Sequence, residues 1–257
     1  MVTMKTLLKT IAGCLALSSS SAPFAAAQSS ESSLPTPKVI FFDVNETLLD
    51  LEDLRSSVAE ALDGRDDLLG LWFSTMLHHS LVDTATERFH TFGEIGVSAL
   101  LMVAESKGIE LTEEEARKAI VTPLRSLPPH PDVKKGLARI KATGITLASL
   151  TNSSNRGVQT QFENAELTEY FERRLSVEDI KVYKPDLRSY RWALEQMGVK
   201  PEEAMLVAAH GWDIAGAKAA GMQAAFITRP GKTLYPLAIK PDYVVSDLFE
   251  LAEILEK

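Results

Sequence analysis

The stretch VIFFDVNETL, residues 39–48, places an acidic side chain directly after a short apolar run. Its first four residues are β-branched or aromatic, which is typical of a buried strand. The run ends at Asp43, and short polar residues follow as far as Thr47. Open α/β sheets bind their ligands in the crevice outside the carboxyl ends of the strands. The stretch therefore predicts a central strand with Asp43 at the edge of a functional crevice.

Beyond residue 132, apolar runs alternate with amphipathic segments. This pattern predicts strands over 145–150, 204–209, 223–227 and 243–245, and helices over 133–142, 156–165, 187–197, 213–220 and 248–255. Strands that alternate with helices imply a parallel sheet whose two faces are both covered. We therefore expect an α/β fold with a doubly wound, Rossmann-like core.

A helical insert separates the first strand from this alternation. Apolar residues recur at helical spacing over residues 51–125, and no stretch there is typical of a strand. Helices are expected over 68–81 and 96–108, and Thr112 with Glu115 forms a capping-box signature that opens a third. A proline-rich stretch then ends the helical pattern. The expected domains are a core of residues 38–52 and 128–257 and a helical cap of residues 53–127.

Composition and charge exclude several classes of partner. Of the 257 residues, 45% are hydrophobic and 24% are charged, which is ordinary for a soluble globular protein. The formal net charge of −8 argues against nucleic acid and anionic membrane surfaces as partners. An anionic substrate gains no long-range attraction from such a chain, so local groups must bind it.

Residues 1–27 resemble a signal peptide. Lys5 and Lys9 precede a brief apolar stretch, and a run of three alanines ends at Ala27, as at a small-residue cleavage site. The apolar stretch is far shorter than the ~20 residues that a membrane span needs. Residues 28–37 are rich in Ser and Pro, which is typical of a linker. We expect export to the periplasm or secretion, with cleavage near Ala27.

Two other interpretations of this N-terminus stay open. The sequence Ile-Ala-Gly-Cys that ends at Cys14 resembles a lipoprotein box, although Lys9 leaves little apolar sequence before it. A disordered tail is the other interpretation. Cleavage after Ala27 removes the only cysteine of the chain, which suits an oxidising compartment without requiring a disulfide.

Four polar segments are expected at the ends of strands in the core. They are residues 43–47, Thr151 with Asn152, Lys184, and residues 210–213. In a parallel sheet the carboxyl ends of the strands meet at one crevice. A carboxylate, a hydroxyl, an ammonium and a second carboxylate gathered there are suited to covalent catalysis.

The order and wording of these segments resemble the type II 2-haloacid dehalogenases of the haloacid dehalogenase (HAD) superfamily. The resemblance covers roughly residues 37–250, including a helical cap after the first motif. It implies an (S)-2-haloacid dehalogenase that uses no metal and no other cofactor. In that family an Asp carboxylate displaces halide from C2 of a short 2-haloalkanoic acid, and water then hydrolyses the ester at the carboxyl carbon of the enzyme. Related enzymes are often dimers, so the resemblance also allows a homodimer.

Matches to the family motifs assign roles within this resemblance. Asp43 is the expected nucleophile, which Lys184 keeps ionised and aimed. Thr47 and Asp213 are expected to complete the catalytic set with them. Six further side chains are expected to bind substrate, and they are Asn45, Phe73, Thr151, Asn152, Tyr190 and Trp212. The family pair that holds the substrate carboxylate falls on Thr151 and Asn152.

Departures from the family pattern refine this expectation. Phe73 stands where an arginine usually follows a Leu-Trp pair, and Asn45 stands where a tyrosine is common. Glu46 replaces a glycine, and His210 replaces an asparagine. A histidine beside a carboxylate can act as a general base, so we hypothesise that Glu46 orients His210 and that His210 activates the hydrolytic water. The positive ring edges of Phe73 and Trp212 are expected to form an apolar halide pocket.

Two alternatives from other classes are kept. A HAD phosphatase acting on a small phosphate ester needs a second Asp for its Mg²⁺ site and its acid/base step, and Asn45 occupies that position. A catalytically silent, exported binding domain is the other alternative. The expected partner is a small 2-haloacid, with no nucleic acid and no membrane span.

Overall fold

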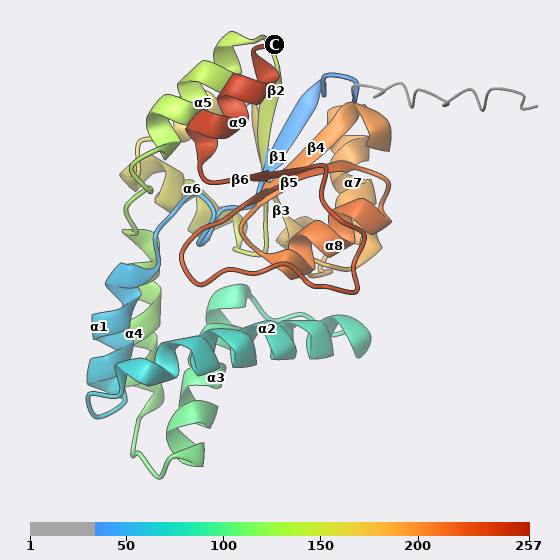
Figure 1. Ribbon diagram of the computed structural model, residues 1–257. Coiled ribbons are helices and arrows are strands. Elements are labelled where there is room, and N and C mark those ends of the chain that lie inside the picture. Colours follow the sequence, from blue (N-terminus) through green and yellow to red (C-terminus); the bar gives the residue numbers. More distant parts are fainter. Residues whose placement is uncertain (1–33) are drawn as a thin grey trace, which may run out of the picture. The chain divides into compact units, whose positions relative to one another are not determined.

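The computed structural model describes residues 34–257, apart from the side chain of Asp53, and is drawn in Figure 1. Residues 35–257 form one compact unit. The predicted signal peptide, its alternative lipid site at Cys14 and most of the predicted linker lie outside the described residues.

A six-stranded sheet, parallel throughout, forms the centre of this unit in the order β3-β2-β1-β4-β5-β6. The strands are β1 (Val39–Phe42), β2 (Thr146–Thr151), β3 (Arg173–Ser176), β4 (Ala204–Ala208), β5 (Gln223–Ile227) and β6 (Tyr243–Val245). Strand β1 is buried along its length, and its last residue, Phe42, pairs with Ser149 of β2 and Val207 of β4. The chain runs outward from β1 to β3 and then returns to β4. The boundary between β1 and β4 is therefore the topological switch point, where such sheets bind ligands.

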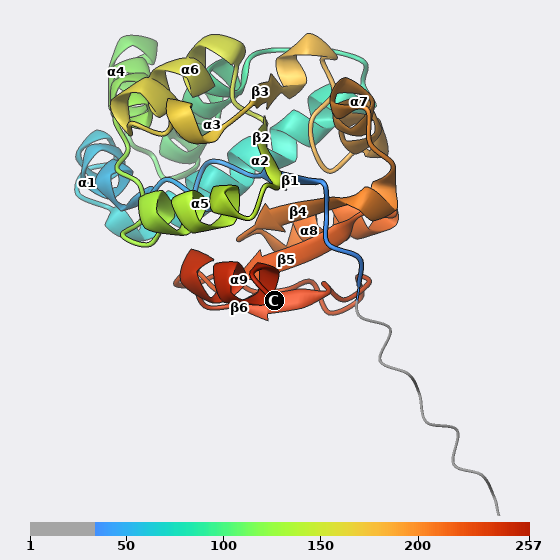
Figure 2. The same ribbon diagram turned by 90° about the horizontal axis from the view of Figure 1, so that it is seen from above.

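Helices cover both faces of the sheet. Figures 1 and 2 show α5 (Val133–Ala142), α6 (Asn155–Asn164) and α9 (Leu248–Leu255) on one side of the sheet. On the other side lie α7 (Leu187–Met197) and α8 (Gly211–Ala219). A sheet buried on both faces explains why its inner strands are continuous apolar runs rather than alternating ones.

Four helices between β1 and α5 form the cap. They are α1 (Glu52–Ala61), α2 (Leu69–Ala85), α3 (Phe92–Ser106) and α4 (Glu113–Arg125). Capping boxes open α3 at Thr91 and α4 at Thr112, which satisfies backbone N–H groups at both helix starts. The indole of Trp72 on α2 donates a hydrogen bond to the Gly96 carbonyl of α3 at 2.8 Å. Figure 1 shows the cap on the side of the sheet where β1 ends.

The predicted α/β class, the doubly wound parallel core and the helical cap after the first strand are confirmed. The expected element pattern lacked β3, where two exposed arginines begin a short strand at the edge of the sheet. Helix α3 begins at Phe92, earlier than expected, because a capping box at Thr91 opens it. The sequence prediction missed this capping box. The core and cap boundaries remain predictions. Within residues 34–257 no helix has both the length and the apolar character needed to cross a bilayer.

Candidate active site

Asp43 leaves β1 directly into the crevice and is 5% exposed. Its backbone N–H donates to the Val207 carbonyl of β4 at 3.0 Å, so the sheet ladder continues to the functional residue. The Thr47 hydroxyl donates to Asp43 Oδ2 at 2.7 Å and accepts from the backbone N–H of Ala209 at 2.9 Å. These bonds fix the carboxylate at the switch point between β1 and β4.

Lys184 ties Asp43 to a second carboxylate. Its Nζ donates to Asp43 Oδ1 at 3.0 Å, to Asp213 Oδ2 at 2.5 Å and to the Leu150 carbonyl at 2.8 Å. The Tyr190 hydroxyl donates to Asp213 Oδ1 at 2.6 Å. All three ammonium hydrogens are used, and the whole group is buried away from solvent.

A glycine makes this cluster possible. Gly216 on α8 faces the Tyr190 ring so closely that a Cβ there would overlap the hydroxyl. Because the helix offers no side chain at that point, Tyr190 on α7 can reach Asp213 at the start of α8.

His210 lies on the other side of Asp43. Its Nδ1 lies 3.0 Å from Asp43 Oδ2, and its Nε2 lies 2.7 Å from Glu46 Oε2. The imidazole also stacks between two aromatic rings, Phe73 at 5.8 Å and Trp212 at 5.0 Å between centroids. The structure therefore brings together the histidine and the glutamate that the sequence predicted at one crevice, and it adds a direct contact between His210 and Asp43.

Glu46 is held in an unusual backbone conformation. Its φ is +62°, in the left-handed region that a non-glycine residue enters at a cost of about 1–2 kcal/mol. Its second carboxylate oxygen forms an ion pair with Lys232, whose ammonium also lies over the Phe73 ring at 5.6 Å from the centroid. The result is a continuous chain of contacts from Asp43 through His210 and Glu46 to Lys232.

Electrostatics hold Asp43 ionised. Burial alone raises the pKa of Asp43, but the charge of Lys184 and the hydrogen bond from His210 reverse this and hold that pKa well below its ordinary value. Burial also opposes ionisation of Glu46, yet His210 and Lys232 lower its pKa. Burial lowers the pKa of His210, but its bonds to Asp43 and Glu46 outweigh this and raise that pKa to about 9. His210 is therefore an imidazolium in the resting protein at neutral pH.

Burial and charge also shift the pKa values of Lys184, Asp213 and Tyr190. Burial raises the pKa of Asp213, and Lys184 opposes that effect. Burial lowers the pKa of Lys184, but the two carboxylates Asp213 and Asp43 raise it above its ordinary value. Burial and Asp213 together raise the pKa of Tyr190, which stays a neutral hydrogen-bond donor.

The remaining predicted residues hold the loops around the site. Asn152 Oδ1 accepts from the backbone N–H of Lys184 at 3.0 Å, and the Thr151 hydroxyl accepts from the backbone N–H of Ser153 at 3.1 Å. The amide of Asn45 donates to the Ser153 hydroxyl. Trp212 contributes its ring, which stacks on His210 as described above. A substrate role for these side chains stays a prediction.

Two basic residues of the site were missed from sequence. Lys232 follows the end of β5, and Arg229 lies in the same loop. Arg229 binds both carboxylate oxygens of Asp132 and donates twice to the Thr47 carbonyl, so it anchors the loop that follows Asp43. The polar stretch that follows β5 could have indicated these residues, because β5 lies next to β4 and neighbouring strand ends share one crevice.

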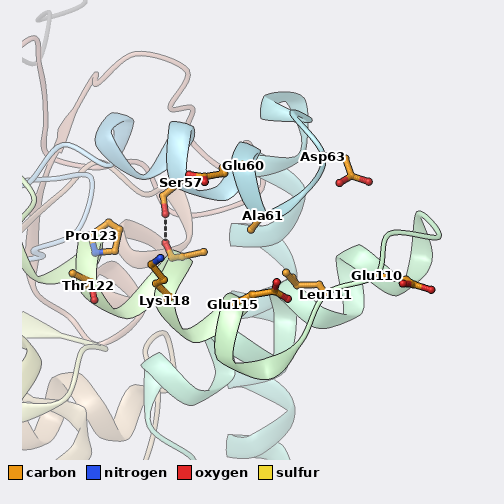
Figure 3. A pocket seen from close by; sticks show the side chains of 11 residues that line it. Ser57, Glu60, Ala61, Asp63, Glu110, Leu111, Glu115, Lys118, Thr122 and Pro123 are labelled. Atoms are coloured by element: carbon orange, nitrogen blue, oxygen red, sulfur yellow. Dashed lines mark hydrogen bonds between the residues drawn. The ribbon is translucent and has the colours of Figure 1, made fainter.

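Two clefts differ in their relation to this site. One, of about 570 Å³, is lined by Glu46, Phe73 and Lys232 together with Asp50, Glu52 and Arg55, and its lining does not include Asp43 or His210. The other, of about 590 Å³, lies in the cap between α1 and α4 and is drawn in Figure 3. Its lining includes Glu60 and Glu115 and none of the predicted site residues.

Within residues 34–257 no three His, Cys, Asp or Glu side chains are grouped so that they could hold a metal ion.

Comparisons with known proteins show which family this chain resembles. Residues 37–221 match the family described as haloacid dehalogenase-like hydrolase. The (S)-2-haloacid dehalogenase 1 of Pseudomonas sp. (strain CBS-3) is 31% identical over 215 residues, which are 83% of this chain and 94% of that protein. The haloacetate dehalogenase H-2 of Moraxella sp. (strain B) is 28% identical, over 81% of this chain and 93% of that protein. The structure of L-2-haloacid dehalogenase from Xanthobacter autotrophicus with chloropropionic acid covalently bound is similar with a TM-score of 0.80 at 25% identity, over 86% of this chain and 98% of that chain.

Proposed function

The chain belongs to the haloacid dehalogenase-like hydrolases, and we propose that it hydrolyses short-chain 2-haloalkanoic acids to 2-hydroxy acids. The observation that carries the proposal is the setting of Asp43, a buried carboxylate that Lys184 and His210 hold ionised at the end of the central strand. A carboxylate positioned in this way is suited to form a covalent intermediate. The substrate class comes from the related dehalogenases.

The first half-reaction is alkylation of Asp43. The carboxylate attacks C2 of the substrate, a carbon–oxygen bond forms, and halide leaves with the electrons of the carbon–halogen bond. The imidazolium of His210, stacked between Phe73 and Trp212, places positive charge beside the reacting centre. This step produces an ester on Asp43 and free halide, and it transfers no proton.

The second half-reaction is hydrolysis of that ester. Esterification removes the charge of Asp43, which is one of the two that raise the pKa of His210, so that pKa falls and the ring loses a proton to solvent. Nε2 keeps the hydrogen that it donates to Glu46. The nitrogen that faces Asp43, Nδ1, therefore becomes the free acceptor. It takes a proton from water as the water attacks the carboxyl carbon of Asp43. The second hydrogen of that water passes to the leaving oxygen, so the 2-hydroxy acid leaves, Asp43 is a carboxylate again and His210 is again an imidazolium.

This sequence of states sharpens the predicted Glu46–His210 pair. In the resting protein His210 is charged and supports the nucleophile, so it can act as a base only after Asp43 is alkylated. Glu46 serves both states, because its bond to Nε2 determines which ring nitrogen is free.

The rival phosphatase is disfavoured by the contacts of Asn45. Its Oδ1 accepts from Gln161 Nε2 at 2.9 Å, and its amide nitrogen donates to the Ser153 hydroxyl at 3.1 Å. The side chain is uncharged, and both of its ends are bonded to the protein. It cannot act as the acid/base that phosphoryl chemistry uses at this position. Hydrolysis of p-nitrophenyl phosphate that depends strictly on Mg²⁺ would favour the rival.

Halide release from (S)-2-chloropropionate tests the proposed function, with the (R)-enantiomer and fluoroacetate as comparison substrates. We expect release from the (S)-enantiomer that EDTA does not abolish. After turnover in H₂¹⁸O, mass spectrometry should find ¹⁸O in the Asp43 carboxylate, because water attacks that carbon. The Asp43→Asn variant is the control and should release no halide. Equal behaviour of this variant and the natural chain in every assay would instead support the silent binding domain.

We also propose that the protein is exported and that residues 1–27 are cleaved as a signal peptide. The basic start, the short apolar stretch and the alanines before Gln28 support this. Cell fractionation with N-terminal sequencing of the mature chain tests it, and a cytoplasmic chain that begins at Met1 would contradict it. A homodimer, proposed from the resemblance alone, is tested by light scattering of the purified protein.

A further inference from the structure

Glu46 lies at the base of the two chain segments that connect the sheet with the cap. Its backbone N–H donates to the Leu49 carbonyl at 2.8 Å, in the segment that leads into α1. Its carbonyl oxygen faces His130 Nε2 at 3.2 Å, in the segment that returns from α4 to α5. The two segments also bind each other, because the Asp50 N–H donates to the Pro128 carbonyl at 2.8 Å. The left-handed backbone of Glu46 therefore lies where the cap joins the core.

Gln161 on α6 ties the end of the cap to the residue before Glu46. Its side chain is buried, and its Nε2 donates to the Leu124 carbonyl and to Asn45 Oδ1, both at 2.9 Å. Helix α6 lies beside α4 (Figure 2). Because α4 ends at Arg125, its last carbonyls have no N–H partner within the helix, and Gln161 satisfies one of them. Both amide hydrogens are thus used, one on the cap and one on Asn45.

Asn45 connects Gln161 to the backbone of Glu46. Besides the bond that its Oδ1 accepts, its Nδ2 donates to the Ser153 hydroxyl at 3.1 Å, so both ends of the amide are held. Rotation of Glu46 out of its left-handed conformation would move the peptide group that it shares with Asn45 and disturb both bonds. A residue in a sparsely populated conformation persists only where its surroundings hold it there, and Asn45 is part of those surroundings.

A neighbouring side chain shows what a purely structural bond between the two helices looks like. Asn164 also lies on α6, and its Nδ2 donates to the Arg125 carbonyl at 2.9 Å. It is exposed, and this bond joins α6 to α4 without involving Asn45. Gln161 is 1% exposed, and its Oε1 has no hydrogen-bond partner within residues 34–257, which costs free energy. A bond between α4 and α6 does not require this cost, whereas a bond that also reaches Asn45 requires a buried amide.

We infer that Gln161 is a positioning residue that couples the cap to the active site. Through Asn45 it holds the backbone conformation in which Glu46 meets His210. Glu46 Oε2 lies 2.7 Å from His210 Nε2, so this conformation decides whether the imidazole keeps its second carboxylate. A shift of the end of α4 away from α6 would break the first bond of this chain of contacts. The effect on turnover rests on the proposed function, but the coupling between Gln161 and His210 does not.

The test compares Gln161→Met with the control Asn164→Leu. Each variant removes one side-chain amide of α6 and keeps a side chain of similar size, but only Gln161→Met releases Asn45. The main measurement is an NMR titration of the His210 imidazole, which the spectrum of His210→Asn identifies among the five histidines of the chain. Halide release gives the turnover, and thermal unfolding verifies that each variant is folded.

We expect Gln161→Met to lower the pKa of His210 from about 9 towards its ordinary value of 6.5, because Glu46 is one of the two carboxylates that raise it. The other carboxylate, Asp43, stays in place. Turnover of (S)-2-chloropropionate should fall by at least about tenfold. Asn164→Leu should change neither. If Gln161→Met lowers only the thermal stability and keeps the natural pKa of His210 and the natural turnover, Gln161 is a structural bond between two helices, and the inference is wrong.

A second variant shows whether Gln161 acts through Asn45. Asn45→Ala removes the acceptor and leaves the bond between Gln161 and the Leu124 carbonyl intact. It should lower the pKa of His210 as Gln161→Met does, and the double variant should lower it no further, because both changes break one chain of contacts. Additive effects on that pKa would contradict this route. An unchanged pKa of His210 in Asn45→Ala overturns the inference even if Gln161→Met does not fold.

The titration separates this inference from the proposed function, because it needs no turnover. A lower pKa of His210 in Gln161→Met supports the coupling even if the natural chain releases no halide. Halide release by the natural chain, with a pKa of His210 that neither Gln161→Met nor Asn45→Ala changes, overturns the coupling alone.

Discussion

The two sides of Asp43 are built on opposite principles. On one side Lys184, Asp213 and Tyr190 are fully buried, and every donor is used. On the other side His210 leads to Glu46 and Lys232, whose side chains are 18% and 21% exposed. That second side also has a left-handed backbone at Glu46 and a ring contributed by the cap.

This difference suggests that the two sides have separate roles. One side holds Asp43 in place, and the other takes part in the proposed reaction. The closed Lys184 side keeps Asp43 ionised and has no capacity to bind anything else. The open His210 side carries strain, spare donors and a group whose charge can change during turnover. Substitutions on the closed side should therefore affect folding most, and those on the open side should affect activity most.

The largest expected effect is that of Lys184→Met. It leaves Asp43 and Asp213 buried without their shared cation, and breaking a buried ion pair costs about 3–5 kcal/mol. Urea unfolding at pH 7 measures this loss, and halide release should disappear. Lys38→Met, which removes a solvent-exposed pair with Glu203, should cost about 1 kcal/mol or less. Equal unfolding midpoints for the two variants would contradict the description of the closed side.

Much of the fold could be predicted because the buried strands consist of apolar residues. Val39–Phe42 is covered on both faces, so its residues are all apolar, and the polar residue that follows marks the crevice. Strand β3 could not be predicted, because only its last two residues are buried at the sheet edge. Its identity as a strand depends on pairing with β2 rather than on its own composition.

The candidate site was predictable where parallel strand ends determine it. Asp43, Lys184 and His210 meet because they follow strands or loops at one edge of the sheet. Lys232 lies five positions beyond the end of β5, and its position depends on its contacts with Glu46 and the cap residue Phe73. Local sequence could not show that these contacts form, because they join segments far apart in the chain.

His210→Asn should have the next largest effect, and that effect depends on pH. The pKa of His210 is about 9 in the folded protein and about 6.5 when unfolded, so its charge stabilises the fold fully below about pH 6.5. This contribution, about 3 kcal/mol at most, is lost as pH rises towards 9. Urea unfolding should show natural chain and variant far apart at pH 6 and close together at pH 9.5.

The same variant tests the chemistry. With Asn in place of the imidazole, alkylation should proceed while hydrolysis slows by about 10²–10⁴-fold. Intact-protein mass spectrometry should then detect the ester on Asp43. Normal turnover without any adduct would remove His210 from the hydrolytic step, and a stability difference that does not depend on pH would contradict its charge in the resting protein.

Glu46→Gly should cost activity more than stability. Glycine tolerates a φ of +62°, so relief of about 1–2 kcal/mol of strain should offset part of the stability lost with the contacts to His210 and Lys232. Turnover should fall by at least about tenfold, because His210 loses the partner that orients it. Glu87→Gly, at a φ of +55° on an exposed position, is the control and should be stabilising without affecting activity. A stable Glu46→Gly with full activity would remove Glu46 from the mechanism.

The smallest expected effect is that of Phe73→Leu, which tests whether the cap serves the open side through one ring. Leucine keeps the apolar bulk but loses the stacking on His210 and the face beneath Lys232, an effect of about 0.5–1.5 kcal/mol. KM for (S)-2-chloropropionate should rise a few-fold while the free energy of unfolding changes by about 1 kcal/mol or less. Phe89→Leu removes a similar stack, on Tyr183 at 5.4 Å, and should leave KM unchanged. Because both variants lose comparable ring contacts, only a KM change specific to Phe73 assigns the cap a part in substrate binding, and identical KM values would confine that ring to packing.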